Sequence, residues 1–571
     1  MKPMITKIAF IKMRLLLAAT AAVASLAATA HAAAPGITNS SATFSLTAQD
    51  SYLNQPDGST VYSWGYGCAS GFTPSFLPTV GMPGQNCPTM QIPGPTLIVT
   101  EGQTVTVTLT NNLPTPAGNT SILFPGFQVC AGTLSGGTCI PNPGNGVTGL
   151  LTQEAVPGGS VTYTFVASSP GTHSYYSGTQ SDLQVEMGLF GALIVLPNNV
   201  PASCSNGLPL TNPGNNAAAQ KNWGESDFRL AASAYDNAST CYDREYLFQF
   251  SEMDPNIHAQ ALAQVTALGN CAAGTSGCNL NVPTEPYHPT FFMINGRSMP
   301  DDMDVNYGVQ YPHQPYNGNP HLHPGEQVLL RIIGQGRWQH PFHEHANHVR
   351  ILARDGNLIL TPDGNALAGA PLFTTTTTPG QTMDGIFYFT GRGLNWDMYG
   401  HTPTSFSGDA LAELPCTPDA NGYNTGAPSA VNYFEWCQDH NKPLEAAPFG
   451  DVNGGGPATL PNPLILTNGN WYGGSPYLGP DATLRATTTL RTTSNGSGGT
   501  NGSGGCTSSP GSNCSNLLPS NDQANPSNER GFAFMWHSHN EREITTNNVF
   551  PGGMMMMMLV DSREFVIDES N

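Results

Sequence analysis

The chain has 571 residues, of which only 10% are charged, and its formal net charge is −20 at pH 7. An acidic surface of this kind repels the phosphates of nucleic acid and of anionic lipid, so neither is expected as a partner. Glycine (64 residues) and proline (48 residues) are abundant, and both favour turns over long regular elements. We therefore expect short strands and frequent turns rather than long helices.

The first residues have the features of a secretory signal peptide. Basic residues precede the apolar run 15–19, and Ala30-His31-Ala32 fits a small-x-small cleavage site. Removing residues 1–32 takes away four of the 19 basic residues and none of the 39 acidic ones, which leaves a mature net charge of −24. No other stretch is long and apolar enough to span a bilayer. The sequence thus predicts export, to a bacterial periplasm or to the outside of the cell.

Residues 33–204 are expected to form an all-β unit. Its β-branched runs, bounded by Gly, Pro and Asn, lie at 96–99, 104–109, 160–165 and 191–195. Strands of this length and spacing favour a Greek-key sandwich or barrel. A polar connector rich in Asn and Gly follows at residues 205–225.

Residues 226–571 are expected to form a second β unit. Its apolar runs lie at 291–296, 325–333 and 348–352, and its final strand is expected at 554–560. A stretch of about residues 400–530 interrupts this unit and exceeds ordinary loop lengths. Part of it, 494–508, is rich in Gly, Ser, Thr and Asn, which predicts a flexible surface insertion.

The 12 cysteines fall into pairs that are local in sequence. An even number of cysteines in an exported chain indicates disulfides. Spacing alone leaves their connectivity open, and we expect neighbouring cysteines to pair. The expected pairs are Cys68/Cys87, Cys130/Cys139, Cys204/Cys241, Cys271/Cys278, Cys416/Cys437 and Cys506/Cys514.

Two His-x-His pairs are the most informative feature of the chain. They are His343-Glu344-His345 and His537-Ser538-His539. Strand side chains repeat every second residue, so each pair places two imidazoles on one face of a strand. Four convergent neutral imidazoles suit copper or zinc far better than magnesium or calcium. The alternative is that the histidines are hydrogen-bonded residues of an interior without metal.

Four segments resemble the multicopper oxidases. The segment 340–345 resembles that family's HPxHxH motif, and 536–539 is similar to its C-terminal His-Cys-His motif. The turn at 92–96 and the strand pair within 170–195 match the family's first domain, and the resemblance covers most of residues 90–200, 290–400 and 530–562. It implies tandem cupredoxin domains and copper as the cofactor, while the chemistry of imidazole ligands makes zinc the next candidate. The signal peptide, the connector and the insertion remain outside the resemblance.

The chain departs from the family's pattern at the copper cluster. The resemblance implies eight histidines in four His-x-His pairs, two of the pairs in the first domain. At those first-domain positions the chain has Leu123, Pro125, Tyr176 and Gly178. Only His343, His345, His537 and His539 remain as cluster ligands.

The electron-entry copper site also departs from the pattern. The resemblance places His340 at one ligand position, but Ser538 replaces the cysteine and Glu543 replaces the second histidine. A blue copper site depends on a thiolate, and a hydroxyl is neither soft nor anionic at neutral pH. A conventional laccase cycle is therefore not expected.

Further side chains offer weaker metal sites. His340 with Glu543 would suit a harder ion such as Mn, Fe or Zn, or would form a polar pair without metal. His321 and His323 also have ligand spacing, but loop histidines that are solvated are the favoured interpretation. The run Met554–Met558 offers thioethers for Cu(I), although core packing of alternating methionines is favoured.

Two functions follow from these residues. The first is an exported copper protein with a reduced, histidine-only site, which as an oxidoreductase would act on a small-molecule or metal-ion substrate. Tyr176 would approach this site if the domains pack as in the family. The second is a copper-sequestering or structural surface protein without catalysis. The sequence leaves the oligomeric state open, because the first domain supplies no histidine for a cluster shared between subunits.

Overall fold

The computed structural model describes most of the two predicted β units. The described residues are 34–142, 152–205, 227–269, 271–323, 325–346, 348–387, 389, 415–426, 435–440, 531–561 and 567. The predicted signal peptide, all but the first residue of the connector and most of the predicted insertion lie outside these residues.

The first β unit consists of two sheets that pack face to face. Sheet I has the strand order β3-β2-β6-β9, and sheet II has the order β10-β11-β5-β1-β4. Sheet I comprises β2 (Thr43–Asn54), β3 (Thr60–Cys68), β6 (Thr104–Asn111) and β9 (Ser160–Val166). Sheet II comprises β1 (Gly36–Thr38), β4 (Ser75–Leu77), β5 (Gly94–Thr100), β10 (Gly171–Tyr176) and β11 (Phe190–Leu196), and a separate hairpin joins β7 (Gly132–Ser135) to β8 (Thr138–Pro141).

Alternation of side chains explains how these strands build a core. In β6, Val105, Val107 and Leu109 are buried, whereas the threonines between them face outward. The inward residues pack with Leu97 of β5 and Leu193 of β11 in one apolar cluster between the two sheets. The predicted β-branched runs thus form the strands of a two-sheet sandwich.

The second β unit also consists of two packed sheets. Sheet III has the order β13-β12-β15-β21-β17-β18, with β19 paired to β17, and sheet IV has the order β14-β23-β22-β16-β20. Sheet III comprises β12 (Arg244–Met253), β13 (Phe291–Ile294), β15 (Val328–Gly334), β17 (Val349–Arg354), β18 (Asn357–Leu358), β19 (Pro371–Leu372) and β21 (Thr382–Phe387). Sheet IV comprises β14 (His321–Leu322), β16 (His340–Glu344), β20 (Thr374–Thr377), β22 (Gly531–Ser538) and β23 (Met555–Asp561).

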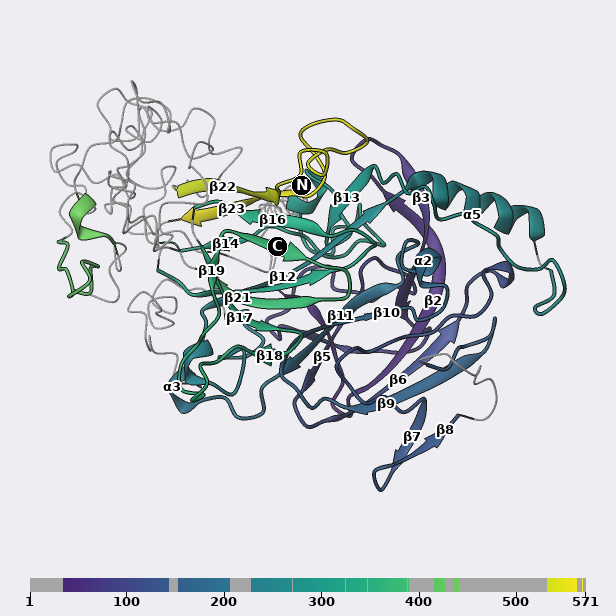
Figure 1. Cartoon of the computed structure of the whole chain (residues 1–571), viewed down its shortest axis with the longest axis horizontal. Coiled ribbons are helices and arrows are strands. Elements are labelled where there is room, and N and C mark those ends of the chain that lie inside the picture. The colour runs from purple at the N-terminus through teal and green to yellow at the C-terminus, as the bar shows by residue number, and fades with distance from the viewer. Residues whose placement is uncertain are drawn as a thin grey trace, which may run out of the picture.

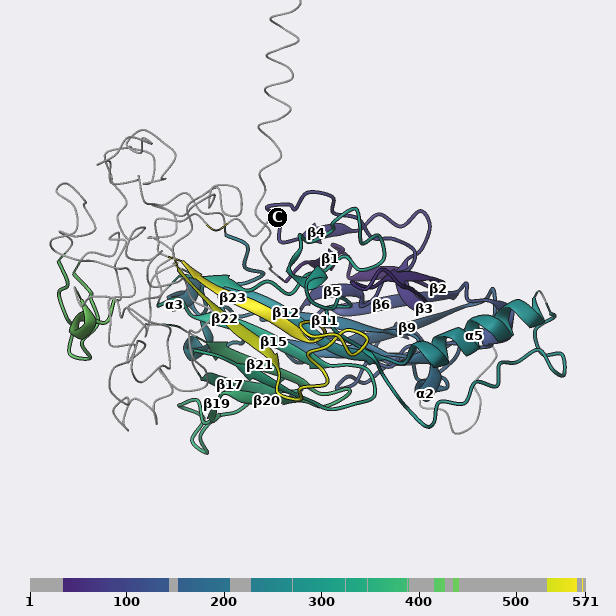
Figure 2. The ribbon, with the colours of Figure 1, turned by 90° about the horizontal axis from the view of Figure 1, so that it is seen from above.

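The four sheets stack as layers, with sheet IV at the top of Figure 1 and β6 and β9 of sheet I at the bottom. Apolar side chains of sheet II, including Ile98 and Ile194, pack against Leu247 and Ile333 of sheet III. A polar contact joins the same two sheets, because the Thr172 hydroxyl donates to Asp384 Oδ1 over 2.5 Å. In the view from above, β22 and β23 of sheet IV are drawn in yellow and cross over the teal strands (Figure 2).

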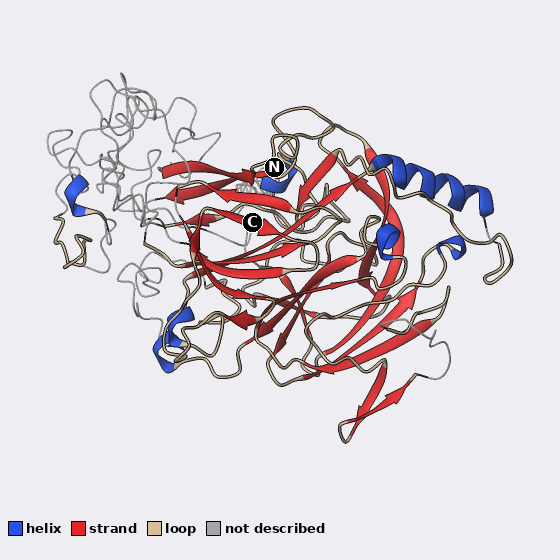
Figure 3. Cartoon of the chain, in the orientation of Figure 1, coloured by secondary structure: helices blue, strands red, loops and turns tan. Residues whose placement is uncertain are grey.

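Helices are short and peripheral, as Figure 3 shows. The longest, α5 (Pro255–Leu268), begins after Asp254, whose side chain accepts a hydrogen bond from the Asn256 backbone N–H. It packs Ile257 and Ala261 against the core of the first unit. The others are α2 (Ser181–Gln184), α3 (Ala202–Ser205), η1 (Thr115–Ala117), η2 (Ala238–Thr240), η3 (Asp301–Met303) and η4 (Cys437–Asp439). Over the described residues, none of the helices has the length and apolar character that crossing a membrane requires.

Five of the six predicted disulfides are present. They join Cys68 to Cys87, Cys130 to Cys139, Cys204 to Cys241, Cys271 to Cys278 and Cys416 to Cys437. The sixth predicted pair, Cys506 and Cys514, lies outside the described residues. The all-β, cupredoxin-like fold class is confirmed. Its division into two domains at 205–225 stays a proposal, supported by sheets that each take their strands from one side of the connector.

Candidate metal centre

The two His-x-His pairs lie on neighbouring strands of sheet IV. Strand β16 pairs antiparallel with β22, and in this register His343 is directly opposite His537. Phe342 and Trp536, which alternate with these histidines, pack into the core between sheets III and IV. The histidines therefore lie on the outer face of sheet IV, as the two-residue repeat of a strand requires.

Three of the four predicted imidazoles converge. One ring nitrogen from each of His343, His345 and His537 lies within 4.8 Å of the corresponding nitrogens of the other two. Nε2 of His345 is 3.1 Å from Nε2 of His537. Two imidazole nitrogens bound to one ion at about 2.0–2.1 Å would be separated by about 3 Å. The spacing of these two rings is thus the spacing of ligands that share a metal ion.

The hydrogen bonds fix which nitrogen is available. Nδ1 of His537 is 2.7 Å from the Ser538 carbonyl oxygen, which only accepts, so Nδ1 carries the proton and Nε2 keeps its lone pair. Nδ1 of His343 is 2.7 Å from the Thr374 hydroxyl. Burial lowers the pKa of His537, and the neighbouring His539 lowers it further. A neutral imidazole held by its second nitrogen is the form that binds metals.

His539 lies at the margin of this cluster. Its ring centroid is 5.0 Å from that of His343 and 5.6 Å from that of His537. Its side chain is exposed, whereas His343, His345 and His537 are buried. The structure therefore places one predicted ligand between the buried group and solvent.

Glu344 lies between His343 and His345 in sequence but on the other face of β16. It is fully buried, and its Oε1 accepts a hydrogen bond of 3.2 Å from Thr375. Burial raises the pKa of Glu344 well above its usual range. The donor set on the histidine face is therefore made of imidazoles without this carboxylate.

The residues at the matched first-domain positions lie close to one another in the first β unit. Sheet II packs on sheet III, and sheet III separates it from sheet IV. The Leu123 backbone pairs with Tyr176, and Leu123 packs against Gly178. The Tyr176 ring lies beside Gly380, in the turn that precedes β21. The approach of Tyr176 to the histidines stays a prediction.

His340 forms a buried ion bridge with two glutamates. Its Nδ1 is 2.9 Å from Oε2 of Glu543, and its Nε2 is 2.9 Å from Oε2 of Glu252. All three side chains are almost fully buried. Sequence analysis predicted the proximity of His340 and Glu543, but it missed Glu252, which comes from β12 without any recognisable spacing.

The three positions that the resemblance matches to the electron-entry copper are His340, Ser538 and Glu543. Ser538 donates a hydrogen bond of 2.5 Å to Glu543 Oε2, so the three matched positions do converge. They supply a hydroxyl and a carboxylate where a thiolate and an imidazole are needed. Carboxylates also hold both ring nitrogens of His340. These residues do not fit a blue copper ion, and a harder ion at His340 and Glu543 remains a prediction of the sequence alone.

The bridge makes the stability of the protein depend on pH. Burial opposes the charge of His340, but the hydrogen bonds that its ring donates to Glu252 and Glu543, and the charges of these carboxylates, outweigh it and raise the pKa of His340 to about 9. The pKa of His340 in the folded protein exceeds its unfolded value of about 6.5. The bridge therefore contributes fully to the stability of the fold below about pH 6.5, and this contribution is lost as the pH rises through about 9. We expect a loss of about 3 kcal/mol, measured as the free energy of unfolding from pH 6 to pH 10. In Glu543→Gln the loss should begin at lower pH, and identical profiles for the two proteins would contradict the bridge.

His321 and His323 are buried, so the favoured interpretation of solvated loop residues is wrong. Their exposed fractions are 0% and 2%, and His321 begins β14, which pairs with β23. Two neighbouring strands hold this segment in place. The His321 backbone N–H donates a hydrogen bond of 3.0 Å to the Tyr246 hydroxyl of β12, and Leu322 pairs with Val560 of β23. Neither histidine belongs to the convergent group above. Metal binding by this pair stays a prediction.

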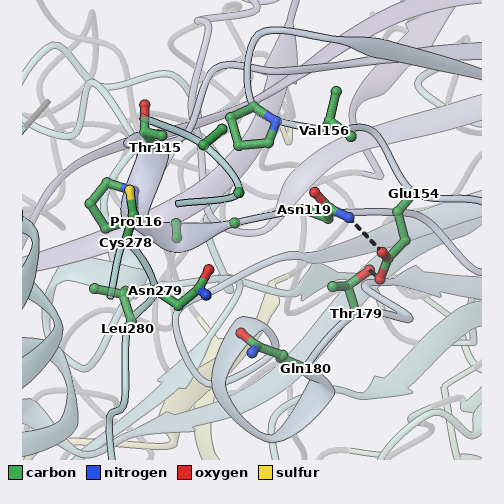
Figure 4. Close-up of a pocket in the computed structure, with 15 residues that line it drawn as sticks. Thr115, Pro116, Asn119, Glu154, Val156, Thr179, Gln180, Cys278, Asn279 and Leu280 are labelled. Atoms are coloured by element: carbon green, nitrogen blue, oxygen red, sulfur yellow. Dashed lines mark hydrogen bonds between the residues drawn. The ribbon is translucent and has the colours of Figure 1, made fainter. Parts of the chain in front are cut away.

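A separate pocket of about 600 Å³ lies between residues of the first unit and the loop that follows α5 (Figure 4). It is lined by residues that follow β6, by residues 179–180 and by the loop that follows α5. Glu154 on its wall accepts hydrogen bonds from Asn119 Nδ2, at 2.8 Å, and from the Thr179 hydroxyl, at 2.7 Å. No histidine lines this pocket, so it offers none of the imidazoles that make up the cluster on sheet IV.

Comparison with known proteins places part of this chain in a family. A family model described as multicopper oxidase matches residues 88–200. The multicopper oxidase MCE of Talaromyces pinophilus is 35% identical over 112 residues, which are 19% of this chain and 16% of that protein. Laccase 1 of Metarhizium acridum (strain CQMa 102) is 35% identical over 107 residues, which are 19% of this chain and 15% of that protein. The matched segment thus spans about a sixth of the length of these relatives.

Solved structures align over more of the chain at lower identity. The multicopper oxidase mgLAC is 14% identical, with a TM-score of 0.41, over 92% of this chain and 88% of that one. A blue copper oxidase from Nitrosomonas europaea is 14% identical, with a TM-score of 0.41, over 91% of this chain and 85% of that one. At scores this low, no feature of those sites is transferred to this chain. Residues 88–200 thus match the multicopper oxidase family, and the chain is similar to that family over this segment.

Proposed function

We propose that this chain is an exported copper-binding protein whose site is made of histidines alone. His343, His345 and His537 would bind the metal, with His539 at the solvent side. The observation that carries the proposal is the convergence of three imidazole nitrogens within 4.8 Å on one buried patch of sheet IV. The fixed Nδ1–H of His537, which leaves Nε2 available, supports it further.

Copper is the favoured metal for two reasons. The superfamily uses copper, and imidazole sites bind Cu²⁺ more tightly than the other divalent first-row ions. Zinc is the next candidate, since it also accepts neutral imidazoles in a tetrahedral site. The cluster contains no carboxylate among the described residues, which disfavours magnesium, calcium and manganese.

As an enzyme, the protein would be an oxidoreductase that couples oxidation of a small-molecule or metal-ion reductant to reduction of oxygen. Bound copper would supply the one-electron chemistry with oxygen. The buried imidazoles would hold the ion, and the exposed His539 would lie where a reductant can approach. Because Ser538 stands in place of a thiolate, electrons would have to enter at the histidine site itself.

A copper-sequestering protein without catalysis is the second candidate. The ion bridge at His340 favours it, because the residues at the electron-entry position do not fit a second copper. The histidine cluster alone would then serve to hold copper.

Export is part of the same proposal. The five disulfides of the described residues are typical of oxidising compartments. Together with the signal-like residues 1–32, they support a periplasmic or secreted location.

Metal analysis of the purified mature protein tests the proposal. We expect at least one copper per chain in the wild type, and a loss of affinity of about 100-fold in His343→Ala and in His537→Ala, because even removing an outer partner of a ligand costs about 10–100-fold. His313→Ala is the control, since hydrogen bonds to the Met90 carbonyl and to Ser51 already occupy both of its ring nitrogens. Oxygen uptake with phenols and with Mn(II) is measured on the copper-loaded protein.

The outcomes separate the candidates. Copper and zinc below one per chain would overturn metal binding. Stoichiometric copper without oxygen uptake would select sequestration over catalysis. An equal loss of copper in His313→Ala would assign the effect to folding and would contradict the ligand roles of His343 and His537.

A further inference from the structure

The methionine run at the end of the chain is divided between two faces of sheet IV. Met554, Met556 and Met558 belong to the apolar core between sheets III and IV. Met555 and Met557 alternate with them on β23 and therefore project to the opposite face. The sequence-based expectation of core packing is thus confirmed for three of the five methionines only.

The outward methionines lie on the face that carries the histidines. In the pairing of β22 with β23, Met555 is directly opposite His537 and Met557 is directly opposite Met535. Met535 is also two residues from His537 along β22, so it shares the same face. Three thioether side chains therefore surround one side of the imidazole cluster.

The distances that the register imposes are short. Side chains directly opposite in an antiparallel pair have Cβ atoms about 4.5–5.5 Å apart. His343, His537 and Met555 form one such row across three strands. The methionine side chain has three rotatable bonds beyond its Cα, so its sulfur can reach an ion held at the neighbouring imidazole.

Burial shows that these methionines are enclosed without belonging to the core. Met555 is 2% exposed, and Met535 and Met557 are half-buried. Met303, whose Sδ is 3.3 Å from the Met557 backbone nitrogen, packs against the core instead. The histidine face thus has an enclosed patch of soft, uncharged donors next to its imidazoles.

Uncharged nitrogen and sulfur donors select the charge of the ion. Thioethers favour Cu(I), whereas oxygen donors favour harder divalent ions. The convergent group contains no carboxylate to offset a second positive charge. A monovalent ion also loses less hydration energy than a divalent one on entering a buried site. All three arguments favour the reduced state of copper.

We propose that this face is a mixed imidazole–thioether site for a soft monovalent cation, Cu(I), with Met555, Met535 and Met557 as its sulfur donors. The proposal rests on the proposed function, because it takes the copper site of His343, His345 and His537 as given. It adds the oxidation state that the protein holds most tightly. Such a site stabilises Cu(I) relative to Cu(II) and binds Ag(I), a redox-inactive ion of the same class.

Alternating residues of one strand provide matched variants. Met555→Leu/Met557→Leu removes sulfur from the histidine face, and Met556→Leu/Met558→Leu removes the same number of sulfur atoms from the core. Leucine and methionine have similar volumes, so both proteins are expected to fold. The full mature chain is titrated with Cu(I) under reducing conditions against a chelator, and separately with Ag(I), and the copper environment is read by X-ray absorption.

We expect the histidine-face variant to bind Cu(I) and Ag(I) at least about tenfold more weakly than wild type, which corresponds to the loss of one modest ligand interaction. The core variant should match wild type in affinity. Copper–sulfur scattering should be present in the wild type and in the core variant, and should be reduced in the histidine-face variant.

Two results overturn the inference in distinguishable ways. Equal Cu(I) affinity in both double variants, with a nitrogen-only copper environment in the wild type, would refute the thioether site and leave the histidine copper site standing. Failure of the wild type to bind copper in either oxidation state would refute the proposed function, and the inference with it.

Discussion

Glu252→Ala is expected to destabilise the protein by about 3–5 kcal/mol, because it breaks a buried ion pair from one side. Oε2 of Glu252 accepts from His340 at 2.9 Å. Its Oε1 accepts from the backbone N–H groups of Arg337 and Trp338, at 2.6 and 2.7 Å. The substitution would leave these donors and the His340 imidazolium without their acceptor in the interior. The loss is measured as the free energy of unfolding in denaturant at pH 7.

Glu285→Ala is the matched control for this prediction. Glu285 pairs with Arg337 over 2.7 Å, close to the same segment, but its side chain is 72% exposed. Water screens exposed pairs, and they contribute at most about 1 kcal/mol. If both substitutions cost the same, the bridge at His340 would contribute no more than a surface pair, and the account given above would be wrong.

The histidine cluster was predictable because it depends on a local rule. The alternation of strand side chains places His343 with His345, and His537 with His539, on one face of their strands. The local rule does not bring the two pairs together. That depends on the register of β16 with β22, which sets His343 opposite His537 and is a property of the sheet. The resemblance to the multicopper oxidases supplied that step. The cluster is thus predicted by sequence, while its ligand role stays a proposal.

Glu252 shows what local rules leave out. It lies on β12, 88 residues before His340, in a strand whose ten residues are all buried. A buried acidic residue in such a strand indicates that a partner exists, but not which one. The partner is decided by the packing of sheet III against sheet IV. The same applies to Met555, whose neighbour His537 follows from the register of β22 with β23.

The fold class was easier to predict than its arrangement. Short β-branched runs between turn residues indicate sheets in any packing. They do not determine that sheet II packs on the face of sheet III opposite to sheet IV.

The double substitution Ser538→Cys/Glu543→His is expected to restore an intense blue copper absorption that the wild type lacks. Nδ1 of His340 already points at Glu543, and Ser538 donates to the same carboxylate, so the three positions converge. Substitution of the other two would supply the thiolate and second imidazole that a blue copper site needs. Glu252 would remain on Nε2 of His340 and hold the ring in its present orientation.

Two variants identify the origin of such a band. Ser538→Ala/Glu543→His supplies the imidazole without a thiolate and should lack the intense blue band with Cu(II). Ser538→Cys alone keeps the carboxylate of Glu543 beside His340 and should give a weaker band, because the ion bridge competes with copper for Nδ1. A copper-loaded double variant with wild-type secondary structure and no visible thiolate band would show that the three positions do not form a copper cage. The band with its expected dependence on both substitutions would show that the ion bridge occupies the place of the electron-entry copper.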